Sequence, residues 1–176
     1  MSWIAGLLRL APRRGAGLGQ AVEAYRKLPA PDLRKPLHTH RYVGVDVETS
    51  GLNPYRDRLI SIGALAISDG LIRFDESFEV VLRQERPSDA RNILIHGIGG
   101  TSQTSGRDSA AGLADFLRFA AKAPLIGFHA DFDRVMIARA ARATLGLQPA
   151  NVWLDLAVLA PALFADRLPP ANTLDD

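Results

Sequence analysis

Residues 42–48, YVGVDVE, are the segment that most restricts the fold, because two acids alternate with valines in a short apolar run. In a β-strand, alternate side chains share a face. The three valines then point to one side of the strand, while Asp46 and Glu48 point to the other. Adjacent carboxylates repel each other, and a divalent cation relieves that repulsion. We therefore expect a buried strand with a cation site on one face.

The segments that follow predict an α/β fold with a mixed sheet. SGLNPYRD and SDG are turn sequences that separate the first three apolar strands. Helical and apolar stretches then alternate, which indicates a three-stranded antiparallel meander, then parallel strands with flanking helices. Gly146 and Asp155 are expected to cap helices. The predicted strands are 42–48, 59–67, 71–82, 124–128 and 152–154, and the predicted helices are 108–122, 130–145 and 156–164.

The start of the chain has no clear periodicity, and residues 1–41 are expected to form an N-terminal arm or helical extension. A packed helix is favoured for residues 1–10 and a short one for 21–28. Residues 42–176 then form the main domain. No run approaches the roughly 20 apolar residues that span a bilayer, and the beginning does not resemble a signal peptide. We therefore expect a cytoplasmic protein without a membrane span.

Composition narrows the chemistry. Cysteine is absent, which excludes disulfides and thiolate metal sites but leaves oxygen-ligated hard cations possible. The net charge is only +2, although the pI is about 9.3. This mild basic excess is compatible with a nucleic-acid partner but does not require one.

A third acid is expected to join the first two. At 100° per residue, Asp133 falls on the apolar face of helix 130–145, with Met136 and Ile137, whereas Asp131 falls on the solvent side with Arg134. An inward carboxylate is costly unless it is paired or coordinates a metal. Asp46, Glu48 and Asp133 together make a set of ligands for Mg²⁺ or Mn²⁺. Two such ions about 4 Å apart catalyse phosphodiester hydrolysis.

At these residues the chain resembles the DEDD 3′–5′ exonucleases, which have an RNase H-like fold, and within them the proofreading epsilon subunit of bacterial DNA polymerase III. DVETSGL is similar to the family's first motif, RLISIGALAI to its second strand, HGI to a loop near the substrate, and FHADFD to its second motif. The resemblance covers residue 41 to the end of the chain. It implies two divalent ions bound by Asp46, Glu48 and Asp133.

The same resemblance implies a substrate and its contacts. The expected activity is release of nucleoside 5′-monophosphates from single-stranded 3′ ends of DNA or RNA, with a DNA polymerase or another replication or repair protein as a partner. The residues expected to contact substrate are Thr49, Ser50, Leu52 and His96. For each of them a purely structural role is the alternative: turn formation for Thr49 and Ser50, core packing for Leu52, and a polar loop position for His96. His129 is interpreted as a structural histidine.

Two features depart from the family pattern. Phe128 and His129 stand where the commoner pattern has His and Asn. No His or Tyr follows His129, so the third motif, with its general-base His and fourth Asp, is lacking, and the chain resembles a member cut short after TLDD. Two alternatives therefore stay open: an RNA-trimming or oligoribonucleotide-degrading exonuclease, and a truncated, non-catalytic nucleic-acid-binding module.

Overall fold

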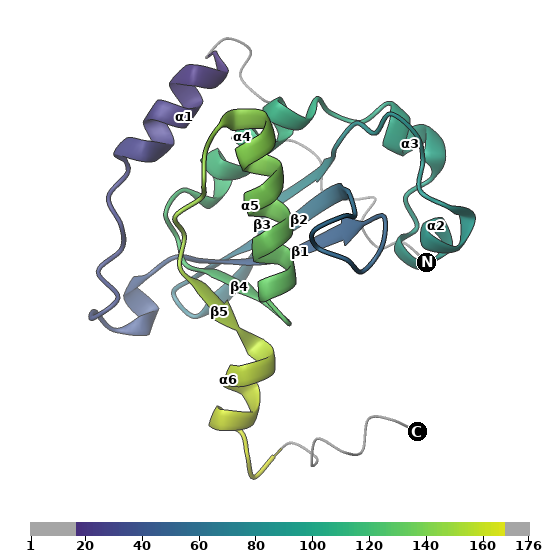
Figure 1. Ribbon diagram of the computed structural model, residues 1–176. Coiled ribbons are helices and arrows are strands. Elements are labelled where there is room, and N and C mark those ends of the chain that lie inside the picture. Colours follow the sequence, from purple (N-terminus) through teal and green to yellow (C-terminus); the bar gives the residue numbers. More distant parts are fainter. Residues whose placement is uncertain (1–16, 168–176) are drawn as a thin grey trace.

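The computed structural model describes residues 17–167, which build a five-stranded mixed sheet with helices packed against it (Figure 1). The strand order is β3-β2-β1-β4-β5. The first three strands are antiparallel neighbours, and β4 and β5 run parallel to β1. The strands are β1 (Tyr42–Thr49), β2 (Leu59–Ser68), β3 (Leu71–Val81), β4 (Leu125–Gly127) and β5 (Trp153–Asp155). The mixed α/β sheet expected from the sequence is confirmed.

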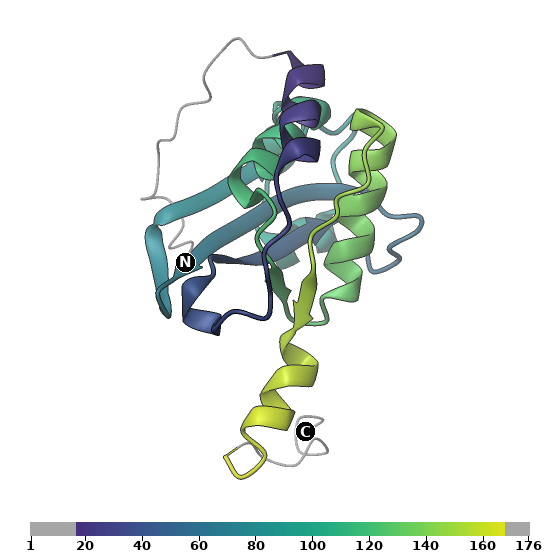
Figure 2. The ribbon, with the colours of Figure 1, turned by 90° about the vertical axis from the view of Figure 1, so that its left-hand side faces the viewer.

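One face of the sheet is covered by α4 and α5, and α1 packs against these two helices (Figures 1 and 2). The helices are α1 (Leu18–Lys27), α2 (Ala90–His96), α3 (Gly100–Thr104), α4 (Ser109–Ala120), α5 (Asp131–Leu145) and α6 (Leu156–Leu163), with a 3-10 turn, η2 (Leu37–Thr39). The predicted helices 108–122, 130–145 and 156–164 correspond to α4, α5 and α6, and the short helix expected at 21–28 corresponds to α1. The sequence analysis missed α2 and α3, because each is short and neither shows a long apolar period.

Turns and caps follow the local sequence. Asp69 and Gly70 join β2 to β3, and both have positive φ angles, 54° and 74°. Asp and Gly tolerate this conformation, and such turns match the twist of a hairpin. Gly146 ends α5 in the left-handed conformation, and the Asp155 side chain accepts a hydrogen bond from the Ala157 backbone at the start of α6. The predicted hairpin and both predicted caps are confirmed.

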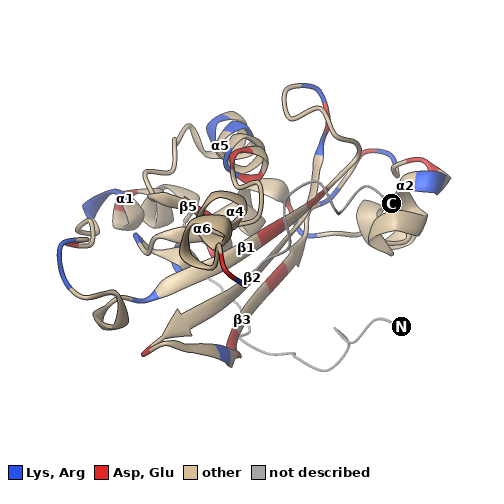
Figure 3. Ribbon diagram, turned by 90° about the horizontal axis from the view of Figure 1, so that it is seen from below, with Lys and Arg blue, Asp and Glu red and all other residues tan. Residues whose placement is uncertain are grey.

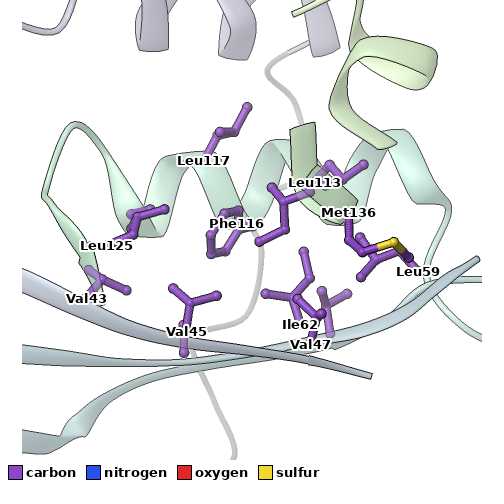
Figure 4. Packing of buried hydrophobic residues seen from close by; sticks show 14 of the residues in the cluster. Val43, Val45, Val47, Leu59, Ile62, Leu113, Phe116, Leu117, Leu125 and Met136 are labelled. Carbon is purple, nitrogen blue, oxygen red and sulfur yellow. The ribbon is translucent and has the colours of Figure 1, made fainter. Parts of the chain in front are cut away.

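The core lies between the sheet and the α4 and α5 helices. Val43, Val45 and Val47 of β1 are buried and point toward the helices, where Figure 4 shows them below Phe116 and Leu113 of α4. Gly44, Asp46 and Glu48 alternate with the valines and are half-buried or exposed. The strand therefore has one face for packing and one face that carries its acids, as predicted.

Helix α1 corrects the expectation that residues 1–41 form an arm outside the core. Val22 and Tyr25 are buried in the main core cluster, and the Tyr25 hydroxyl donates a 2.6 Å hydrogen bond to Asn151 Oδ1. The Lys122 ammonium also lies 3.7 Å from the centre of the Tyr25 ring. Two buried residues in an otherwise polar helix gave too weak a pattern to predict this packing. The helix favoured for residues 1–10 lies outside the described residues.

Helix α6 departs from this layered arrangement. It follows β5 and extends away from the body of the domain (Figures 1 and 2). All of its side chains are at least partly exposed, including Val158 and Leu163 at 67% and 70%. Among residues 17–167, no helix has the length and apolar character needed to cross a membrane.

Candidate active site

The two acids of β1 lie on the sheet face opposite the valines. Asp46 as a whole is exposed to solvent. Its carboxyl group is nevertheless partly buried, and this burial raises its pKa. Hydrogen bonding from the Val47 backbone partly offsets that rise. Burial also raises the pKa of Glu48, and the negative charge of Asp46 adds to the effect. The strand thus holds two carboxylates that disfavour each other's charge.

Asp133 is the buried member of the set. The residue is only 4% exposed, on the first turn of α5, whereas the Asp131 side chain is 88% exposed and pairs with Arg134. The inward position predicted for Asp133 is therefore confirmed. The pKa of Asp133 is raised to about 7: burial is the main cause, the charges of Asp46 and, to a smaller extent, Asp155 add to the rise, and backbone hydrogen bonds oppose it.

Sheet geometry explains how a residue of α5 reaches the β1 acids. Strands β1 and β4 pair in parallel at Val43 and Gly44, but β4 ends at Gly127 while β1 continues to Thr49. Beyond that end, hydrogen bonding from the Val47 backbone N–H favours the charged forms of both Asp46 and Asp133. A Cβ at Gly127 would lie 3.3 Å from Asp133 Oδ2. Glycine therefore leaves room for the carboxyl.

Asp155 is a fourth acid beside the site, and the sequence analysis gave it only the capping role. It ends β5, directly paired with Gly127, and its charge raises the pKa of Asp133. Its Oδ1 accepts hydrogen bonds from the backbone N–H groups of His129, at 3.0 Å, and Ala157, at 2.9 Å. The carboxyl ends of neighbouring parallel strands lie at the same edge of a sheet. The acid at the end of β5 was therefore the sequence signal that could have placed Asp155 beside the site. Figure 3 marks in red the acidic segments of β1 and of the start of α5.

The donor set suits a hard divalent cation. Burial and mutual repulsion raise the pKa values of neighbouring carboxylates. A bound cation relieves this repulsion in place of a proton. Among the described residues, no three His, Cys, Asp or Glu side chains lie close enough together to hold a metal ion. The structure brings Asp46 and Asp133 near each other but does not gather Asp46, Glu48 and Asp133 into one three-carboxylate site, so their role as metal ligands stays a prediction.

The turn after β1 is built by hydrogen bonds among its own residues. The Thr49 hydroxyl donates to the Gly51 carbonyl at 2.7 Å, and the Ser50 hydroxyl donates to Asp57 Oδ1 at 3.1 Å. Asp57 Oδ2 accepts from the Asn53 backbone N–H at 2.8 Å. A Cβ on Gly51 would lie 2.6 Å from Asp57 Oδ2, so glycine is needed there. The hydroxyls of Thr49 and Ser50 thus hold the turn together.

Two apolar side chains project from this turn. Leu52 is 92% exposed and Tyr55 is 75% exposed. Core packing was the structural alternative for Leu52, and this exposure excludes it. Arg139 of α5 donates a hydrogen bond to the Asp57 carbonyl, which ties the turn to the helix that carries Asp133. The turn is therefore a preorganised projection beside the acids.

His96 ends α2 rather than lying in a loop. Its Nδ1 accepts from the Ile98 backbone N–H at 2.9 Å, and its Nε2 lies 2.9 Å from Asn92 Oδ1 and 3.3 Å from Ser88 Oγ. Burial lowers the pKa of this imidazole. Both ring nitrogens therefore serve the structure of residues 88–98. The polar side chains of Thr49, Ser50 and His96 all make hydrogen bonds within the protein. The substrate contacts expected at these three residues remain predictions.

Comparison with known families and proteins identifies several relatives. The family model RNase_T, described as an exonuclease, matches residues 43–172. A PolC-type DNA polymerase III from Thermotoga petrophila is 30% identical over 126 residues, which are 72% of this chain and 9% of that protein. A DNA polymerase III subunit epsilon-like protein from Rhodobacter capsulatus is 29% identical over 130 residues, 73% of this chain and 18% of that protein. The chain thus spans less than a fifth of these relatives.

Solved structures share the fold. Apo Exonuclease I has a TM-score of 0.61 at 19% sequence identity, covering 73% of this chain and 32% of that one. E. coli Exonuclease I in complex with a dT13 oligonucleotide gives a TM-score of 0.60 at 20% identity, covering 73% of this chain and 30% of that one. At these identities the likeness establishes the fold alone. It confirms the RNase H-like architecture expected from the sequence.

Proposed function

The chain belongs to the RNase_T exonuclease family, and from this membership we propose that it is a metal-dependent 3′–5′ exonuclease acting on single-stranded 3′ ends of DNA or RNA. One observation supports the proposal above all others. Asp133 of α5 and Asp46 of β1 converge where β4 ends, and the negative charge of Asp46 contributes to an Asp133 pKa of about 7. Strongly raised carboxyl pKa values gather at functional sites.

Asp46, Glu48 and Asp133 are the proposed metal ligands. Two divalent cations, Mg²⁺ or Mn²⁺, would supply an activated water and stabilise the leaving oxygen of a phosphodiester. Asp133 has to lose its proton before it can act as a ligand, and its raised pKa places that loss near neutral pH. Backbone donation from Val47 favours the charged carboxylates and holds two of them at one point of the sheet.

Leu52 is the proposed contact for the terminal nucleotide, because it projects from a turn that already has its internal hydrogen bonds. Thr49 and Ser50 would support this contact by fixing the turn, whereas the role proposed for His96 is to stabilise the end of α2. Hydrolysis would release nucleoside 5′-monophosphates. The PolC-type and epsilon-like relatives are named as polymerases or their subunits, and this supports a role beside a DNA polymerase, in proofreading or another replication or repair step.

The sequence has no His or Tyr at the position where the family has its general base. No His or Tyr follows His129 in the sequence. We propose that full activity requires a general base and a further carboxylate in addition to Asp46, Glu48 and Asp133.

The direct test is degradation of a labelled single strand. Wild-type chain, Asp46→Asn and Asp75→Asn are incubated with Mn²⁺ and strands labelled at either end. Asp75 is a matched control, because its side chain is 68% exposed on β3 and pairs with Arg73 of the same strand. With wild type and the control, the 3′-labelled strand should release labelled mononucleotide from the start of the reaction. The 5′-labelled strand should give a ladder of progressively shorter products. Equal rates for wild type and Asp46→Asn would refute carboxylate-driven hydrolysis.

Matched DNA and RNA strands separate the proofreading and RNA-trimming alternatives. Faster degradation of RNA would support the oligoribonucleotide-degrading alternative. Single-strand binding without degradation of either strand would instead support the non-catalytic binding module. That result would contradict the proposed catalysis for this chain.

A further inference from the structure

Phe128 is a large aromatic side chain that the fold leaves in solvent at the edge of the acidic site. It follows the last residue of β4 and is 66% exposed. An exposed apolar residue is common by itself and needs no explanation. The position of Phe128 relative to the acids is what gives it a role.

Strand register places Ile126, two residues before Phe128, on the same face of the sheet as Gly44 and Asp46. In the parallel pairing of β1 with β4, Val43 lies opposite Leu125, and Gly44 lies opposite Ile126. Leu125 and Gly127 are buried, so Ile126 alternates onto the face of Gly44 and Asp46. Phe128 directly follows the end of β4, where β1 continues past it with Asp46 and Glu48. Gly127, the residue before it, lies against Asp133.

The corner that carries Phe128 is held in place from several directions. His129 has a φ angle of 56°, a conformation that a residue with a Cβ adopts at an energetic cost. Its backbone N–H donates to Asp155 Oδ1 at 3.0 Å, and its carbonyl accepts from the Phe132 N–H at 3.1 Å. The two rings of Phe128 and His129 meet edge to face, with centroids 4.6 Å apart. A strained and pinned corner of this kind is typical of functional sites.

We propose that Phe128 stacks on a nucleobase of the single strand and so positions the 3′ end over the carboxylates. This inference rests on the proposed function and adds a substrate-binding residue to it. An aromatic face accepts any base, because every base has a π-face, so the contact would give affinity without sequence preference. The sugar–phosphate backbone would then lie between this ring and the acids.

The test measures binding, not catalysis. Fluorescently labelled single strands are titrated with the whole chain in Ca²⁺, and each of the last three nucleotides is replaced in turn by an abasic residue. Phe128→Ala should weaken binding of the normal strand roughly 5- to 150-fold, the range that follows from losing one base–aromatic stack. On the strand that lacks the stacked base, the same substitution should cause no further loss. Phe128→Trp should restore binding.

Phe74→Ala is the matched control, because Phe74 is also an exposed aromatic, at 53%, but lies on β3 away from the acids. It should bind every strand as wild type does. Equal affinity of Phe128→Ala and wild type, or an equal loss on normal and abasic strands, would overturn the inference and leave the proposed function standing. Failure of the wild type to bind any single strand would overturn the proposed function itself.

Discussion

Asp133 of helix α5 and Asp46 of strand β1 lie close enough that the negative charge of one raises the pKa of the other. These residues are far apart in the sequence and meet only because β4 ends before β1 does. The pair concentrates negative charge at a half-buried point of the sheet edge. This pair and the turns around it have four measurable consequences.

The first prediction concerns stability in the absence of metal. Asp133 has a folded pKa of about 7, against an ordinary value of 3.8. Between these values the folded protein holds a proton that the unfolded chain has lost, so the free energy of unfolding falls as pH rises from about 4 to 7. At 1.36 kcal/mol per pKa unit, the loss reaches at most about 4 kcal/mol. Urea denaturation in EDTA at a series of pH values measures it.

Asp133→Asn isolates the contribution of this one group. Asn cannot titrate, so the slope between pH 4 and 7 should flatten, and the variant should exceed wild type in stability at pH 8 without metal. Asp131→Asn is the control, because the Asp131 side chain is 88% exposed. An unchanged slope in Asp133→Asn would show that other groups cause the pH dependence.

A second prediction concerns metal addition. At pH 8, Mn²⁺ should raise the thermal midpoint of wild type, because the ion binds carboxylates that otherwise repel each other. At a hundredfold excess over its Kd, a ligand that binds only the folded state contributes about 2.7 kcal/mol. EDTA should reverse the shift, and at pH 5.5 the shift should be smaller, since Asp133 keeps its proton.

Asp46→Asn should remove most of the Mn²⁺ shift, while Asp75→Asn should preserve it. Differential scanning fluorimetry measures all three proteins side by side. A shift of the same size in wild type and Asp46→Asn would place the ion somewhere other than β1.

A third prediction concerns the turn of residues 50–58. Asp57→Ala removes the acceptor for the Ser50 hydroxyl and for the Asn53 backbone N–H. We expect a loss of about 1–3 kcal/mol in the free energy of unfolding, the usual cost when donors lose a charged acceptor. Hydrogen exchange of the Asn53 amide should also accelerate, which identifies the turn as the place of the change.

Asp75→Ala serves as the comparison for that measurement, because its ion pair with Arg73 is exposed. Exposed pairs contribute roughly 0–1 kcal/mol. If both alanine variants lost the same small amount, the turn would not depend on Asp57.

A fourth prediction separates the two roles considered for His96. Its ring nitrogens bridge Ile98, Asn92 and Ser88. His96→Ala should therefore lower the free energy of unfolding by about 1–3 kcal/mol, because these groups lose their partner. The KM for a single strand, measured well below the unfolding temperature, should stay near the wild-type value. A raised KM at unchanged stability would instead make His96 a substrate contact.

Much of the sheet followed directly from sequence patterns. The alternation of valines and acids predicted both faces of β1, and turn chemistry predicted the β2–β3 hairpin. The wheel position of Asp133 predicted its burial, because an amphipathic helix fixes which side faces the sheet. These features depend on neighbours within a few residues, and local pattern suffices for them.

Other features depended on contacts between distant segments. Tyr25 is buried in the core and its hydroxyl donates a hydrogen bond to Asn151 Oδ1, a pairing that no local pattern contains. Asp155 joins the acidic site only through the parallel pairing of β5 with β4. Residues 90–96 form a helix with Asp89 as its cap, yet too few residues were available for an apolar period to show.

In strand β1 the odd-numbered residues are buried, and the even-numbered residues include both acids of the proposed site. An aspartate codon becomes an asparagine codon by one base change, and at position 46 such a change touches no core contact. Under the proposed function, loss of catalysis would therefore be separable from loss of folding. A copy with asparagine at position 46 would keep its sheet, its turn and its exposed aromatic ring, and would bind a strand end without cutting it.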